Sequence, residues 1–129
     1  MQRTCESLIQ EAKKVSQNAY APYSKFLVGA CALFESGNIY IGCNVENGSY
    51  GLSLCAERNA LSNAIAAGEK TKLEAIAIYS PNMPVCTPCG ACRQWIYEFS
   101  SDADVILEDK DGIIKTIPIK ELLPHTFSL

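Results

Sequence analysis

Three cysteines and one glutamate carry the most specific chemistry in this sequence. Glu57 follows Cys55 by two residues, and Cys89 and Cys92 are three residues apart. Residues with that spacing share one face of a helix, so Cys89 and Cys92 can bind one ion together. Both cysteine motifs lie near the expected start of a helix, where the helix dipole favours thiolates. Three thiolates with a fourth position open are the pattern of catalytic zinc, because structural zinc sites use four protein ligands.

Glu57 is close enough to Cys55 to border this open position without being a ligand. Zinc lowers the pKa of a bound water from about 15.7 to about 7, and a neighbouring carboxylate can then accept its proton. Three thiolates give zinc a net negative charge, which opposes that deprotonation. Arg58 and Arg93 directly follow Glu57 and Cys92. We therefore expect a guanidinium to donate to the thiolates and to restore the Lewis acidity of the metal.

The cysteines also allow other interpretations. A Cys-x-x-Cys pair alone occurs in redox sites and in structural zinc knuckles. Cys86, Cys89 and Cys92 have the spacing of iron–sulfur ligands, but Trp95 stands where that pattern needs a fourth cysteine. We interpret Cys86 as a thiol that binds no metal. The remaining thiols are interpreted as small hydrophobic residues, namely Cys5, Cys31 and Cys43.

The composition favours one globular domain over residues 1–129 that acts on a small molecule. Hydrophobic residues make up 48% and charged residues 19% of the chain, and the net charge is -3. An acidic chain lacks the basic surface that long nucleic acids require, so we expect no polynucleotide partner. No apolar run approaches the roughly 20 residues of a membrane span, and no secretory signal is visible. We therefore expect a cytoplasmic protein with no membrane partner, whose seven cysteines are free or bind metal.

Hydrophobic periodicity and turn residues predict an alternation of helices and strands. Helices are expected over residues 5–18, 53–67, 88–99 and 119–123, with Thr87 as the N-cap of the third and Pro88 as its first residue. Strands are expected over residues 26–34, 39–42, 75–79, 105–107 and 113–117. A hairpin followed by β-α-β units predicts an α/β protein with a mixed sheet and helices packed on it.

The motifs around the cysteines resemble those of a known enzyme family. Cys55-Ala56-Glu57-Arg58 and Pro88-Cys89-Gly90-Ala91-Cys92-Arg93-Gln94 are similar to the signature of the small, homotetrameric, zinc-dependent cytidine deaminases. The likeness extends over most of the chain, through residues 23–30, 44–50 and 122–127. It implies a three-layer α-β-α fold with a five-stranded mixed sheet. It also implies zinc as the cofactor and a homotetramer with shared active sites.

The resemblance implies a role for each matched residue near the metal. The three cysteines would bind zinc, and Glu57 would carry protons. Arg58 and Gln94 would donate to the thiolates. Tyr50 and Phe127 would reach the active site of a neighbouring subunit, which would make the tetramer part of the catalytic machinery.

The resemblance also implies how a nucleoside is held and what happens to it. Asn44 and Glu46 would bind the ribose 3′-hydroxyl, Phe26 would pack against the pyrimidine ring, and the backbone of Ala56 would read the cytosine edge. The implied reaction is hydrolytic deamination of cytidine and 2′-deoxycytidine in pyrimidine salvage. In that reaction zinc hydroxide attacks C4, and Glu57 passes protons to N3 and to the leaving amine.

Two alternatives differ from this hypothesis in substrate or in class. Related folds deaminate guanine, blasticidin or cytosine in polynucleotides, but Asn44 and Glu46 favour a free ribose. A noncatalytic binding module stabilised by zinc would need a fourth ligand, rather than Glu57 beside three cysteines. Deamination of a free nucleoside is therefore the favoured hypothesis.

Overall fold

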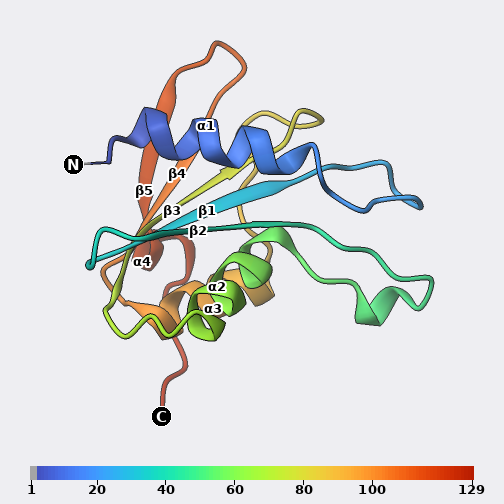
Figure 1. Cartoon of the computed structure of the whole chain (residues 1–129). Helices are drawn as coiled ribbons and strands as arrows, with labels where there is room; N and C mark the ends of the chain where they lie inside the picture. The colour runs from blue at the N-terminus through green and yellow to red at the C-terminus, as the bar shows by residue number, and fades with distance from the viewer. Residues whose placement is uncertain (1–2) are drawn as a thin grey trace.

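A computed structural model describes residues 3–129 and contains one five-stranded sheet between helices (Figure 1). The strands are β1 (Gly29–Phe34), β2 (Ile39–Cys43), β3 (Leu73–Tyr79), β4 (Asp104–Glu108) and β5 (Ile114–Pro118). Their order across the sheet is β2-β1-β3-β4-β5. The pair β3–β4 is parallel and the other pairs are antiparallel. The expected mixed sheet is therefore confirmed.

Helices cover both faces of the sheet, which gives the three layers that were expected. The helices are α1 (Cys5–Ser16), α2 (Ala56–Ala66), α3 (Gly90–Phe99) and the short α4 (Ile119–Leu122), with a 3-10 turn over Tyr50–Leu52. Figure 1 shows α1 on one face and both α2 and α3 on the other. Strand β1 is buried along its whole length. Its side chains alternate, so that Cys31 and Leu33 join the core under α1, whereas Ala30 and Ala32 join the core under α2 and α3.

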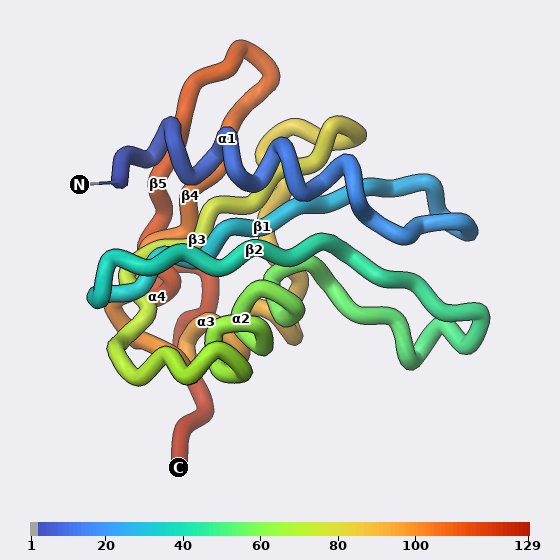
Figure 2. Tube along the Cα trace, viewed as in Figure 1, coloured from blue at the N-terminus to red at the C-terminus, as the bar shows by residue number. Residues whose placement is uncertain are grey.

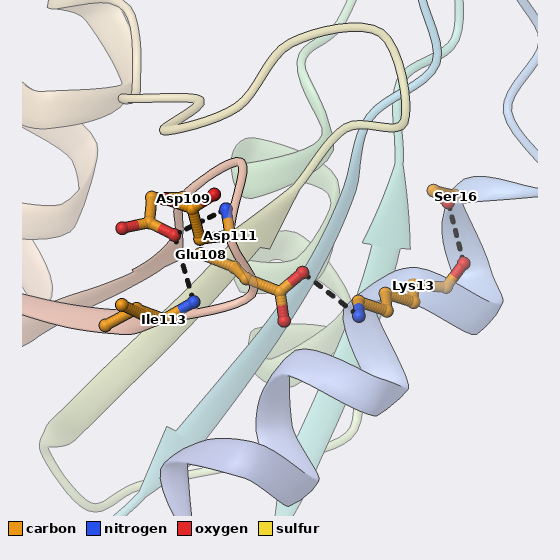
Figure 3. Close-up of polar contacts among 6 residues, drawn as sticks. All are labelled: Lys13, Ser16, Glu108, Asp109, Asp111 and Ile113. Carbon is orange, nitrogen blue, oxygen red and sulfur yellow. Dashed lines mark hydrogen bonds and ion pairs between the residues drawn. The ribbon is translucent and has the colours of Figure 1, made fainter.

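Polar contacts join α1 to the end of β4 and stabilise the turn that follows β4 (Figure 3). Lys13 Nζ in α1 lies 3.0 Å from Glu108 Oε1 at the end of β4. The Asp109 carboxylate accepts hydrogen bonds from the backbone N–H groups of Asp111 (2.9 Å) and Ile113 (3.0 Å). These bonds form the tight turn between β4 and β5, as a short acidic side chain commonly does.

Several element boundaries differ from the sequence-based prediction by a few residues; α2, for example, begins at Ala56 instead of residue 53. Two other differences have an identifiable physical cause. The strand expected over residues 26–34 begins only at Gly29, because the N–H groups of residues 26–28 bind side chains instead of a neighbouring strand. The helix expected from Thr87 and Pro88 begins later, with Cys89 as its N-cap in an extended conformation. Arg93 Nε donates to the carbonyl oxygen of Pro88 at 2.7 Å, and this bond holds Pro88 outside the helix.

Two loops project from one end of the sheet and lie side by side. Figure 2 shows that residues 17–28 and residues 44–55 extend beyond the sheet in the same direction. The N–H of Tyr20 donates to the carbonyl of Asn44 at 3.0 Å, and the N–H of Glu46 donates to the carbonyl of Tyr20 at 2.8 Å. None of the helices within residues 3–129 has the length and apolar character that crossing a bilayer requires.

Helix α2 lies directly on strand β2 at Gly42. A Cβ atom at Gly42 would lie 2.4 Å from the backbone nitrogen of Ala60 and 2.6 Å from the carbonyl oxygen of Ala56. Real Cβ atoms essentially never approach other atoms so closely. Glycine is therefore required here, because any side chain would push away the helix that begins beside Cys55.

We expect the substitution Gly42→Ala to lower the free energy of unfolding by about 2–4 kcal/mol, because α2 must move off the sheet. Denaturant unfolding monitored by circular dichroism measures this change. Gly51→Ala is the matched control, because a Cβ at Gly51 meets nothing within 4 Å, and it should change stability by less than about 0.5 kcal/mol. Equal stabilities for the two variants would contradict the close packing.

Candidate metal and active site

The three cysteines of the sequence motifs meet where two helices begin. Cys55 is the N-cap of α2, and Cys89 is the N-cap of α3, with Cys92 in the first turn of α3. Their sulfur atoms all lie within 4.8 Å of one another, and Cys55 Sγ is 3.7 Å from Cys89 Sγ. Since both helices point their N-termini at this cluster, their dipoles favour negative charge on the sulfurs.

The donor set of this cluster fits zinc. Zinc accepts thiolate ligands in tetrahedral geometry, and a catalytic zinc has three protein ligands and one open position. Within residues 3–129, the cluster consists of Cys55, Cys89 and Cys92. Cys86 is buried nearby but lies outside it, and burial raises the pKa of its thiol to about 11. The cluster therefore supplies three sulfur ligands and leaves a fourth place for a non-protein group.

Arg58 is the cation beside these sulfurs. Its Nη2 lies 3.5 Å from Cys55 Sγ. A hydrogen bond from the Cys92 thiol lowers the pKa of Cys55 to about 5, with further help from hydrogen bonds of Arg58 and Cys89. The same coupling to Cys55, together with burial, raises the pKa of Cys92. The Arg58 guanidinium therefore supports a negative charge on the sulfur of Cys55.

Glu57 lies in the first turn of α2, two residues after Cys55. Its side chain is buried, and the residue is only 4% exposed. Burial, followed by the negative charge of Cys55, raises the pKa of Glu57 to about 7. A carboxyl group with this pKa can both accept and release a proton near neutral pH, which is the property of a general acid–base.

A cavity of about 390 Å³ opens over Glu57 and the cysteines. It brings together three sequence-distant segments: the stretch before β1, the loop after β2, and the loop before α3. Its lining residues are Ser24, Phe26, Val28, Asn44, Glu46, Ser53, Leu54, Cys55, Ala56, Glu57, Cys86, Thr87 and Cys89. The structure thus gathers Phe26, Asn44, Glu46 and Ala56 around one space with Glu57.

The amide of Asn44 is already bonded to the wall of this cavity. Its Oδ1 accepts from the N–H of Val28 and its Nδ2 donates to the carbonyl of Phe26, both at 2.8 Å. An amide nitrogen carries two hydrogens, so one donor of Asn44 is left for another partner. Asn44 therefore holds Phe26 in place in addition to facing the cavity.

Glu46 is held in one orientation by hydrogen bonds from the preceding loop. Its Oε1 accepts from the N–H groups of Tyr23 (3.0 Å) and Ser24 (3.1 Å), and its Oε2 accepts from the Ser24 hydroxyl. The Ser24 hydroxyl is the main cause of the lowered pKa of Glu46, which stays an anionic acceptor. The sequence motifs did not single out Ser24; the only local signal was its place in a turn after Pro22.

Three other expected residues lie outside the cavity of this chain. Tyr50 and Phe127 are 75% and 67% exposed and do not line it. The resemblance implied that the Gln94 amide donates to a thiolate. In the structure it donates instead to the carbonyl of Phe127 at 3.1 Å. Gln94 is two positions after Cys92, and residues two apart do not share a helix face.

Arg93 is not the guanidinium beside the thiolates. Its Nε donates to Pro88 at 2.7 Å and its Nη1 donates to the carbonyl of Leu122 at 2.9 Å. Arg58 therefore supplies the expected guanidinium, and Arg93 has other partners. The position directly after Cys92 points about 100° away from it around the helix, so Arg93 instead ties the cysteine loop to the C-terminal segment.

Comparison with known families identifies this arrangement. The family profile described as "Cytidine and deoxycytidylate deaminase zinc-binding region" matches residues 2–108, which include all three cysteines. The chain belongs to this deaminase family. Zinc is the cofactor of this deaminase, and Cys55, Cys89 and Cys92 form a group that could hold it.

Relatives and solved structures agree over nearly the whole deaminase. Cytidine deaminases from Sporosarcina psychrophila and Halalkalibacterium halodurans are 44% and 43% identical to it over 124 residues, which are 95% of this chain and 90% and 93% of theirs. The crystal structure of cytidine deaminase from Burkholderia pseudomallei has a TM-score of 0.91 and 42% identity, covering 97% of this chain and 100% of that chain. The three-layer fold of this family is therefore confirmed.

We expect Cys89→Ala to lose zinc and Cys86→Ala to retain it. Both cysteines line the same cavity, but only Cys89 belongs to the sulfur cluster. Elemental analysis of the purified variants measures the zinc content per chain. A full zinc equivalent in Cys89→Ala, or loss of zinc in Cys86→Ala, would refute the assignment of ligands.

Proposed function

We propose that the protein deaminates free cytidine and 2′-deoxycytidine to uridine and 2′-deoxyuridine, a reaction of pyrimidine salvage. One observation carries this proposal: a buried carboxyl group, Glu57, lines a cavity of about 390 Å³ together with Cys55 and Cys89 of the three-cysteine cluster. The cytidine deaminases that resemble the chain over 95% of its length support the same substrate.

The chemistry divides between the metal and the residues of the chain. When bound, zinc supplies the Lewis acidity that makes water a nucleophile at neutral pH. Glu57 accepts a proton from the attacking water and delivers it to N3 of the pyrimidine as the new bond forms at C4. It then passes a second proton to the amino group, and the C4–N bond breaks to release ammonia. One water is consumed for each ammonia released.

The other cavity residues hold the nucleoside in the pose that this reaction needs. Phe26 packs against the pyrimidine ring, and the backbone of Ala56 hydrogen-bonds the cytosine edge. The free donor of Asn44 and the anionic carboxylate of Glu46 bind the ribose 3′-hydroxyl. Arg58 draws charge from Cys55, which keeps the metal acidic.

The charge of the cavity favours a nucleoside over a nucleotide. It contains two carboxyl groups, Glu46 and Glu57, beside the sulfur cluster. Among the described residues that line it, none is lysine, arginine or histidine. A phosphate would therefore enter an anionic cavity without a cationic partner, at a cost that a neutral nucleoside avoids. The same argument disfavours a polynucleotide.

We also propose that residues 1–129 act as one domain in a cytoplasmic homotetramer. All seven cysteines are free thiols, which suits a reducing compartment. Tyr50 and Phe127 are exposed large aromatic residues, and both are available to enter a cavity of a neighbouring subunit. Native mass spectrometry tests the assembly, and a monomer that is fully active would contradict the shared site.

We expect Glu57→Gln to retain zinc and to lose turnover by about 10²- to 10⁴-fold, the contribution of a positioned general acid–base. Glutamine keeps the size of the side chain but cannot carry the proton. Ammonia release from cytidine and zinc content are measured on the same preparation. Near-normal turnover would refute proton transfer by Glu57, and loss of zinc would show that the residue also holds the metal.

We expect cytidine and 2′-deoxycytidine to be deaminated at least about 100-fold more efficiently than their 5′-monophosphates, in kcat/KM. The missing cationic partner for the phosphate is the physical reason. Loss of the ultraviolet absorbance of cytosine follows each reaction, with and without a zinc chelator. Preference for the monophosphates would refute the nucleoside assignment, and full activity after removal of zinc would refute the role of the metal.

A further inference from the structure

The cavity wall formed by residues 24–28, here called the Phe26 wall, is held largely by side chains, although the N–H of Asn44 also donates to the carbonyl of Val28 at 3.3 Å. It leads into β1, and three of its residues line the cavity. Three successive N–H groups of the wall donate to side-chain oxygens: Phe26 to Ser24 (3.0 Å), Leu27 to Asn82 (2.9 Å) and Val28 to Asn44 (2.8 Å). The position of Phe26 therefore depends on these three acceptors.

The Phe26 wall needs such restraint because its backbone is strained. Lys25, directly before Phe26, has φ 63°, in the left-handed region that non-glycine residues rarely adopt. Strained residues persist only where their surroundings fix them. If one of the three acceptors is lost, the wall can relax and carry the ring of Phe26 away from the cavity.

Asn82 differs from the other two acceptors because it does not line the cavity. It lies in the loop of residues 80–89, which joins β3 to α3. Its own N–H donates to the hydroxyl of the buried Ser80 at 3.1 Å, which fixes the start of this loop. Its side chain contacts the Phe26 wall through the N–H of Leu27.

The bond from Leu27 to Asn82 joins two sides of the cavity that are 55 positions apart in the sequence. The loop that carries Asn82 continues to Cys86, Thr87 and the zinc ligand Cys89, all of which line the cavity. The same loop is anchored to β4 by a 3.0 Å bond from the N–H of Val85 to the carbonyl of Glu108. The Phe26 wall is thus hydrogen-bonded to the loop that carries Cys89.

We propose that Asn82 is a positioning residue for deamination, which fixes Phe26 against the pyrimidine by accepting the N–H of Leu27. This inference rests on the proposed function, in which the base packs against Phe26. Asn82 touches neither the substrate nor the metal in this role. Its contribution is to substrate binding, so its loss raises KM more than it lowers kcat.

The first test compares Asn82→Ala with Asn82→Asp. Loss of one hydrogen bond in Asn82→Ala should raise KM for cytidine by about 3- to 10-fold, with kcat within about twofold and zinc content unchanged. Aspartate keeps an oxygen at the acceptor position, so Asn82→Asp should restore KM to within about twofold of the wild type. Unchanged KM in Asn82→Ala, or failure of rescue by aspartate, would overturn the proposal.

Met83→Ala is the matched control in the same loop. Met83 is adjacent, exposed and outside the cavity lining, so its truncation should leave KM unchanged. An equal rise of KM in this variant would indicate general loosening of the loop and overturn the specific role of Asn82. A double-mutant cycle with Phe26→Ala adds a second criterion. Asn82→Ala should raise KM little further in that background, and a fully multiplicative effect would refute action through Phe26.

Hydrogen exchange at the Leu27 amide separates this proposal from the proposed function. Exchange should be faster in Asn82→Ala and unchanged in Asn82→Asp and Met83→Ala, whether or not the protein deaminates cytidine. Unchanged exchange in Asn82→Ala would overturn the positioning role even in an active enzyme. A wild-type protein that protects Leu27 but does not deaminate cytidine would refute the proposed function, and with it the role of Asn82 in deamination.

Discussion

The mutual repulsion of acidic groups that lie together beside one cavity is the constraint on which this structure depends. Three sulfurs lie within 4.8 Å of one another, and Glu57 is buried beside them. Two helix N-termini and the Arg58 guanidinium oppose this repulsion at the sulfurs. At Glu57, burial and the negative charge of Cys55 outweigh the hydrogen bond from its own backbone N–H and raise its pKa to about 7. The pKa of Cys55 is lowered while that of Glu57 is raised, which suits Cys55 to metal binding and Glu57 to proton transfer.

The fold meets this constraint by bringing two helix starts together on one face of the sheet. Helix α2 packs directly on β2 because Gly42 has no side chain. This contact fixes how far Cys55 lies from the sheet. Helix α3 starts from the loop that follows β3, and Arg93 ties that loop to the C-terminal segment. The zinc ligands are therefore placed by rigid elements, whereas the nucleoside is proposed to rest on the two loops that project beyond the sheet.

The sequence could predict those features whose determinants are local. The spacing of Cys89 and Cys92 on one helix, with Cys55 and Glu57 on another, predicted the zinc group. Hydrophobic periodicity and turn residues predicted the mixed α/β sheet. The start of α3 was misplaced because Thr87 and Pro88 are good helix starters, although Arg93 holds Pro88 in the loop. The predicted strand began at residue 26 instead of Gly29 because the apolar pattern of residues 26–28 suits a strand.

The acceptors of the Phe26 wall explain why that error was unavoidable from a local pattern. Asn82 is 55 positions from Leu27, so only the folded chain brings them together.

The most direct measurement of the central claim is zinc K-edge X-ray absorption on the wild-type holoenzyme. The account predicts three sulfur neighbours and one lighter neighbour at the metal. Four sulfur neighbours would mean that a fourth cysteine closes the position needed for catalysis, and that result would contradict the account.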